Sequence, residues 1–124
     1  MLLLDTSFLI ALEQELAENT EGPARRFIAE NRGQGFGVSI ISVAEFAEGF
    51  ENPEEAESFL RKFPKENLHA GVAYLNARMQ SSLPQRLGEN DSWIAATALY
   101  NRRKLVGQDA AFSRVPGLKY VQLS

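Results

Sequence analysis

The chain has 124 residues, no cysteine and a formal net charge of −3 at pH 7. The lack of cysteine excludes disulfide bonds and thiolate metal sites, and the acidic balance argues against a protein that holds nucleic acid by bulk positive charge. A phosphate-handling enzyme is not excluded, because bound divalent cations supply local positive charge. Hydrophobic content of 44% and charged content of 23% fit one globular domain over residues 1–124.

The first half of the chain alternates apolar runs with helical patterns. Leu2–Leu4 form a short apolar run that ends abruptly at Asp5, and apolar residues then recur at helical spacing. We expect two strands and three helices in this half: a strand over Leu2–Leu4, helices over Thr6–Ala17 and Pro23–Glu30, a strand over Gly37–Ile41, and a helix over Ser42–Phe50.

The second half continues the alternation. We expect a helix over Pro53–Phe63, a weak strand over Lys65–Leu68, helices over His69–Leu83 and Ser92–Arg102, a strand over Leu105–Gln108, a loop over Phe112–Gly117, and a closing strand over Lys119–Leu123. Strands that alternate with helices predict a parallel α/β sheet covered on both faces, in which sites lie beyond the carboxyl ends of the strands.

No segment suggests export or a membrane. The apolar start, Met1 to Leu4, is too short for the core of a signal peptide. The longest uncharged stretch, Gly33 to Ala44, is well short of the roughly 20 apolar residues that a membrane helix needs. We therefore expect a cytoplasmic protein without a membrane association.

Four carboxylates fall at one edge of such a sheet. Asp5 ends the first strand, Asp109 follows the strand over Leu105–Gln108, and Glu45 and Asp91 lie near the starts of helices. Taken singly, each has an ordinary explanation as a helix cap, a first-turn acid or an Asx turn. Together they would repel each other, and such a cluster is tolerated mainly when it holds cations. Hard oxygen ligands suit Mg²⁺ or Mn²⁺ better than Zn²⁺.

These positions lie in segments that resemble a known family. The segments are LLLDTSFLIAL at 2–12, SVAEFAEG at 42–49, NDSWIAATAL at 90–99 and LVGQDAAFSRVPGLKYV at 105–121. In this order and spacing they are similar to the PIN domain family, and most of all to VapC-type toxin ribonucleases. The resemblance spans the chain and implies a three-layer α/β/α sandwich with a parallel, roughly five-stranded sheet.

The resemblance also implies chemistry and partners. Asp5, Glu45, Asp91 and Asp109 match the acidic quartet that holds Mg²⁺ or Mn²⁺ in a metal-dependent endoribonuclease. Thr6 and Ser7 match hydroxyl positions beside the first acid, as candidates for supporting the site or contacting phosphate, although capping of the following helix explains them equally well. The implied partners are an RNA substrate, a second copy of the chain in a homodimer, and a cognate antitoxin.

Two further features bear on these expectations. Family members often carry Thr or Ser two residues before the fourth acid, where this chain has Gly107, so a hydroxyl that could orient a carboxylate or water is missing. Phe46, Phe50 and Phe59 form an aromatic group that could line a groove for an antitoxin helix, or could simply belong to the core.

Two other functions stay open at this stage. A PIN scaffold could serve as a non-catalytic binding module. A phosphotransfer enzyme could use Asp5 as its nucleophile, although such enzymes resemble a strand that ends in Asp-x-Asp, and here the third residue is Ser7.

Overall fold

A five-stranded parallel sheet forms the centre of the molecule. The computed structural model describes residues 1–123, and the strand order is β3-β2-β1-β4-β5, with every neighbouring pair parallel. The strands are β1 (Leu2–Leu4), β2 (Phe36–Ser39), β3 (Lys65–Glu66), β4 (Lys104–Gly107) and β5 (Tyr120–Gln122). Since all strands run the same way, their carboxyl ends open onto one edge, with β1 next to β4 at the centre.

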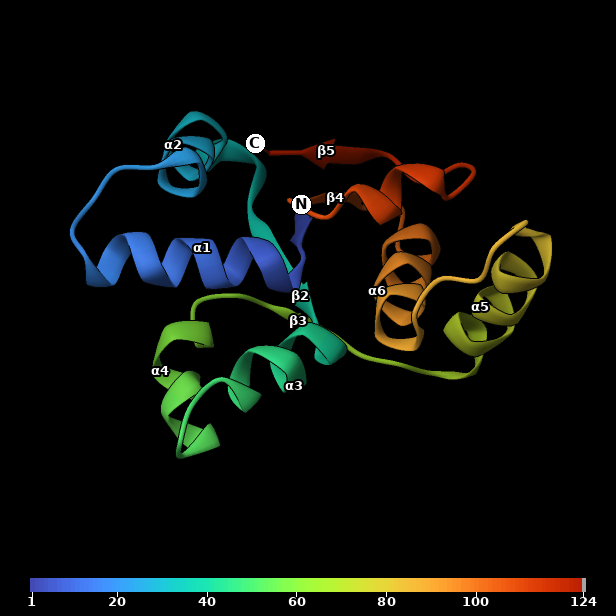
Figure 1. Ribbon diagram of the computed structural model, residues 1–124, viewed down its shortest axis with the longest axis horizontal. Coiled ribbons are helices and arrows are strands. Elements are labelled where there is room, and N and C mark those ends of the chain that lie inside the picture. Colours follow the sequence, from blue (N-terminus) through green and yellow to red (C-terminus); the bar gives the residue numbers. More distant parts are fainter. Residues whose placement is uncertain (124) are drawn as a thin grey trace.

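Helices cover both faces of this sheet. They are α1 (Thr6–Ala17), α2 (Pro23–Glu30), α3 (Ile40–Glu48), α4 (Ala56–Leu60), α5 (Ala70–Ser82) and α6 (Glu89–Tyr100). In the ribbon, α1, α2 and α4 lie on one side of the sheet, and α5 and α6 lie together on the other (Figure 1). The predicted three-layer α/β/α sandwich with a parallel sheet is therefore confirmed. Within residues 1–123, no helix is both long enough and apolar enough to cross a membrane.

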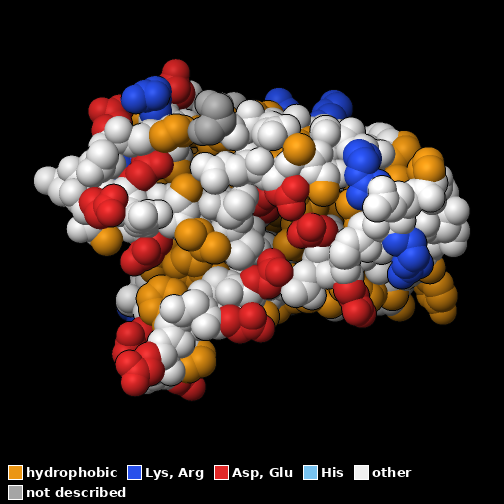
Figure 2. All heavy atoms as spheres, viewed as in Figure 1, with side chains coloured by type: hydrophobic (Ala, Val, Ile, Leu, Met, Phe, Trp, Pro, Cys, Tyr) orange, Lys and Arg blue, Asp and Glu red, His pale blue; other side chains and the backbone are white. Residues whose placement is uncertain are grey.

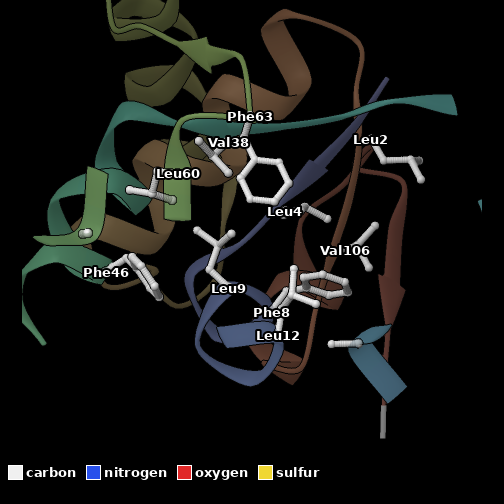
Figure 3. Close-up of a cluster of buried hydrophobic side chains, with 12 residues drawn as sticks. Leu2, Leu4, Phe8, Leu9, Leu12, Val38, Phe46, Leu60, Phe63 and Val106 are labelled. Atoms are coloured by element: carbon white, nitrogen blue, oxygen red, sulfur yellow. The ribbon is translucent and has the colours of Figure 1, made fainter. Parts of the chain in front are cut away.

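Two buried clusters hold the layers together. Leu4 points toward α1 and packs with Phe8, Leu9 and Val38 in the first cluster (Figure 3). Leu3, its neighbour in the strand, belongs to the second cluster on the α5 and α6 side. This alternation follows from the strand geometry, which turns successive side chains to opposite faces. Both faces of β1 are therefore buried, and its carboxyl end is firmly placed.

Several element boundaries differ from the sequence-based expectations. Helix α3 begins at Ile40, because Ser39 caps it by accepting from the Ser42 N–H, so Glu45 lies in the second turn and not near the first. The single helix expected over 53–63 is a 3₁₀ turn (Pro53–Glu55) followed by the short α4.

The other differences lie in the last third of the chain. Helix α6 begins at Glu89, earlier than expected, and a 3₁₀ helix (Ala110–Arg114) replaces the start of the expected loop, with Asp109 as its cap. These shifts leave the order of elements unchanged, but together with the earlier start of α3 they alter the local setting of Glu45, Asp91 and Asp109.

Candidate active site

Asp5 is the centre of the acidic edge. Its carboxylate is 2% exposed, and Oδ1 accepts hydrogen bonds from the Ser7 hydroxyl at 2.7 Å and from the Phe8 N–H at 2.8 Å. Its own N–H donates to the Val106 carbonyl at 2.9 Å, which ties it to β4. Asp5 is thus the N-cap of α1, as the capping explanation predicts, and it is also a buried acid at the sheet edge.

Burial and neighbouring charges act on the ionisation of Asp5. Loss of solvent raises its pKa to about 6, and the carboxylates of Asp109 and Asp91 add to the rise, while the bonds from Ser7 and Phe8 oppose it. An acid in this position favours the protonated form until a cation compensates its charge.

Glu45 is held from two sides. Its Oε1 accepts from the Thr6 hydroxyl at 2.5 Å, and its Oε2 accepts from the Asn90 amide at 3.1 Å. The Thr6 hydroxyl also lies 3.2 Å from that of Ser42. Thr6 therefore links the start of α1 to α3, and Asn90 links α6 to α3.

The structure assigns separate supporting contacts to the two hydroxyl candidates. Ser7 bonds to Asp5 and accepts from the Gln108 N–H at 2.9 Å, and Thr6 bonds to Glu45. Sequence reasoning missed Ser42 and Asn90. Ser42 precedes Glu45 by three residues, and Asn90 immediately precedes Asp91. This closeness to an acid in the family-like segments at 42–49 and 90–99 is the signal that could have identified them.

Asp91 lies in the first turn of α6 and is half-buried. Burial raises its pKa, and the charges of Asp109 and Glu45 raise it further. An open hollow of about 420 Å³ is lined by Glu45, Asp91 and the residues between Gly88 and Asp91. On the face of the molecule that Figure 2 shows, acidic side chains gather across the middle.

Asp109 is the most open of the four acids. It is exposed, and its Oδ1 accepts from the Ala111 N–H at 2.9 Å in an Asx-type cap. Its charge nevertheless raises the pKa of both Asp5 and Asp91, so the three carboxylates share one electrostatic environment. Asp5, Asp91 and Asp109 therefore lie within one another's electrostatic field at this edge of the sheet, and Glu45 joins them through its effect on Asp91.

The donor set suits a hard divalent cation. All four groups are carboxylates, and burial together with the neighbouring negative charges disfavours the charged forms of Asp5 and Asp91, a condition that Mg²⁺ or Mn²⁺ would relieve. As they stand in residues 1–123, no three acid, histidine or cysteine side chains are close enough to hold one ion together. Loading would therefore need side-chain rotation, for which the exposed Asp109 has the most freedom.

The three phenylalanines expected to contact an antitoxin, Phe46, Phe50 and Phe59, pack against one another through Phe46. Phe46 is only 4% exposed and stacks on Phe59, with ring centroids 5.1 Å apart. Phe50 packs edge-on against Phe46 at 5.2 Å. Phe46 is a core residue and offers no surface to a partner, because its ring is covered by the other two. Phe50 and Phe59 are half-buried and keep some free surface.

Comparisons with known proteins agree with this fold. The model of the PIN domain family matches residues 2–118. No match was found among curated protein sequences. A chain in the crystal structure of VapBC2 from Rickettsia felis, bound to a DNA fragment from its promoter, is 19% identical with a TM-score of 0.81, and 98% of each chain is covered.

Two other solved structures are similar to a comparable degree. A toxin–antitoxin complex from Klebsiella pneumoniae contains a chain that is 21% identical with a TM-score of 0.78, covering 98% of this chain and 97% of that one. A chain of VapBC-1 from nontypeable Haemophilus influenzae is 23% identical with a TM-score of 0.77, covering 97% and 96%. At these identities the structures establish a shared fold. Since the family model spans nearly the whole chain, this protein belongs to the PIN domain family.

Proposed function

We propose that this protein is a metal-dependent endoribonuclease and the toxin of a toxin–antitoxin pair. The observation that carries the proposal is the convergence of Asp5, Glu45, Asp91 and Asp109 from four separate segments onto one edge of the sheet. Burial raises the pKa of Asp5 and of Asp91, and the charges of the neighbouring acids raise both further. Repulsion among these carboxylates destabilises the metal-free fold, and a bound cation would relieve it. Their grouping is therefore better explained by a cation site than by a structural role.

The residues would divide the work as follows. Asp5, Asp91 and Asp109 would hold Mg²⁺ or Mn²⁺, with Glu45 as a further ligand or as the group that orients water. The bound cation would polarise a phosphodiester and make water a better nucleophile. Ser7 would keep Asp5 in its orientation, and Thr6 and Asn90 would do the same for Glu45. Without a cation, the carboxylates would repel RNA.

Two experiments separate this proposal from the two rival functions: a metal titration tests the non-catalytic binding module, and trapping of an aspartyl-phosphate tests the phosphotransfer enzyme. A cation that binds only the folded protein raises the melting temperature by mass action. We expect Mn²⁺ or Mg²⁺ to raise that of the wild type, and Asp5→Asn to abolish the shift. A non-catalytic binding module would show no shift. An aspartate-nucleophile enzyme would instead yield a trappable aspartyl-phosphate at Asp5, which we do not expect, because Ser7 stands where such enzymes carry the second aspartate of Asp-x-Asp.

The antitoxin proposal gains support from a groove beside α1 and α2. It has a volume of about 650 Å³, and its apolar lining includes Leu16, Ile28 and Phe63. The cationic side chains of Arg25 and Lys62 also line it. An amphipathic antitoxin helix with apolar and acidic residues would fit this chemistry. The half-buried Phe50 and Phe59 remain a second candidate surface. We further propose that the chain forms a homodimer and acts on cytoplasmic RNA.

A further inference from the structure

Tyr120 carries a buried hydroxyl without a hydrogen-bond partner in the part of the chain that the structure describes. Its ring packs against Phe112, with centroids 5.3 Å apart, and belongs to the second core cluster. A buried polar group left without a partner lowers the stability of the fold, because it has lost its hydrogen bonds to water. Phenylalanine would fill the same space without that cost, so the hydroxyl itself calls for an explanation.

The hydroxyl lies near the acidic edge. Tyr120 lies on β5 opposite Leu105 of the neighbouring β4. Strand β4 ends two residues later at Gly107, and Asp109 follows it. Burial raises the pKa of Tyr120, and the charges of Asp5, Asp109 and Asp91 raise it further, while the Asp109 N–H has the opposite effect. The phenol oxygen thus lies near the Asp109 N–H but outside hydrogen-bond geometry, and within the field of the carboxylates.

No side chain from β4 can supply a hydroxyl at this place. A Cβ at Gly107 would overlap the carboxylate of Asp5, so the position directly before the acidic edge is closed to Ser or Thr. Tyr120 is on the adjacent strand and reaches the same region from the other side of β4. Asp109 has room for one more donor, since Ala111 bonds only to its Oδ1.

We propose that Tyr120 is a positioning residue of the metal site, whose hydroxyl donates a hydrogen bond to the Asp109 carboxylate once that carboxylate turns toward the cation. This inference rests on the proposed function, because the Tyr120 hydroxyl gains the Asp109 carboxylate as an acceptor only when a cation is bound. Outer partners of this kind fix the orientation of a ligand and typically change metal affinity by about 10-fold or more when they are removed.

The test compares Tyr120→Phe with Tyr100→Phe. Tyr100 is an exposed tyrosine that packs against His69 and serves as the matched control. Calorimetric titration with Mn²⁺ should give a dissociation constant about tenfold weaker for Tyr120→Phe and unchanged for Tyr100→Phe. The melting temperature of metal-free Tyr120→Phe should stay level or rise, because no partner is lost. In an Asp109→Asn background, Tyr120→Phe should have no further effect on Mn²⁺ affinity.

Two results would overturn this role. Equal Mn²⁺ affinity of wild type and Tyr120→Phe would remove Tyr120 from the site while leaving the proposed nuclease intact. A weaker affinity that persists undiminished in the Asp109→Asn background would show that the hydroxyl does not act through Asp109. A wild type that binds no Mn²⁺ would instead refute the proposed function itself, and the role of Tyr120 with it.

Discussion

The Asp5 carboxylate occupies the space that a side chain at position 107 would need. A Cβ built on Gly107 would overlap both Oδ2 and Cγ of Asp5. Asp5 cannot easily turn away, because Ser7 and Phe8 hold its Oδ1. Gly107, which from the sequence is a position without the usual hydroxyl, therefore leaves the space that the Asp5 carboxylate fills.

Gly107→Ala should damage both stability and the site. Replacing a strand glycine by alanine normally helps by a few tenths of a kcal/mol, but forcing atoms into a filled space costs about 1–3 kcal/mol, so the clash decides the sign. We expect a lower melting temperature and a loss of Mn²⁺ binding. Gly33→Ala is the control, since nothing lies within 4 Å of its added methyl. A Gly107→Ala protein as stable and as competent in Mn²⁺ binding as the control would contradict this reading of the Asp5 position.

Much of this architecture could be predicted because it follows from local patterns. The apolar run before Asp5 and the helical spacing after it gave the strand and the helix at their observed bounds. The acids could be assigned to one edge because parallel strands end together. The start of α3 was missed because Ser39, within the expected strand, caps the helix through its side chain.

The supporting contacts of the site lay beyond prediction for a different reason. Asn90 meets Glu45 across 45 positions of sequence, and Tyr120 comes near the acidic edge only because β5 pairs with β4. Neither residue type nor spacing marks such pairs. The burial of Phe46 between its neighbours is a tertiary result of the same kind.

Thr6→Val should weaken catalysis more than stability. The substitution keeps the shape of the side chain and removes the hydroxyl that bonds Glu45 at 2.5 Å. Loss of an orienting partner predicts about a tenfold lower cleavage rate, with a stability loss of about 1 kcal/mol. Thr20→Val, at an exposed threonine, is the control and should change neither quantity. If both variants cleave RNA as fast as wild type, Thr6 is only a structural link between α1 and α3.

The stability of the metal-free protein should fall as pH rises through the titration range of Asp5. Its pKa is about 6 in the fold against an ordinary 3.8, so the folded state favours the protonated acid. This stabilisation is fully present below about pH 4, and it is lost between about pH 4 and 6, at a cost of about 3 kcal/mol. Asp5→Asn stays uncharged and its amide oxygen can still accept from Ser7 and Phe8. Its melting temperature should therefore exceed that of wild type by much more at pH 7.5 than at pH 4.5, and a constant difference across this range would argue against the raised pKa.

The groove beside α1 and α2 should be the main antitoxin contact. Leu16 is 44% exposed and lines it, so Leu16→Asp should leave the fold intact and weaken binding of the protein encoded by the adjacent gene. Ile10→Asp is the control, on the same helix, 51% exposed and outside the lining. Phe50→Ala and Phe59→Asp probe the second surface. Unfolding of these two would place them in the core, and binding by Leu16→Asp at wild-type affinity would exclude the groove.

The most direct test is the cleavage of a single-stranded RNA by the purified chain, with Mn²⁺ or Mg²⁺ and with EDTA. We predict cleavage that requires the cation and is abolished by both Asp5→Asn and Asp91→Asn, although each variant should melt at or above the wild-type temperature because repulsion among the acids is relieved. Cleavage at the wild-type rate by both variants, or a wild type that leaves RNA intact with either cation, would contradict the account of this site as a metal-dependent ribonuclease.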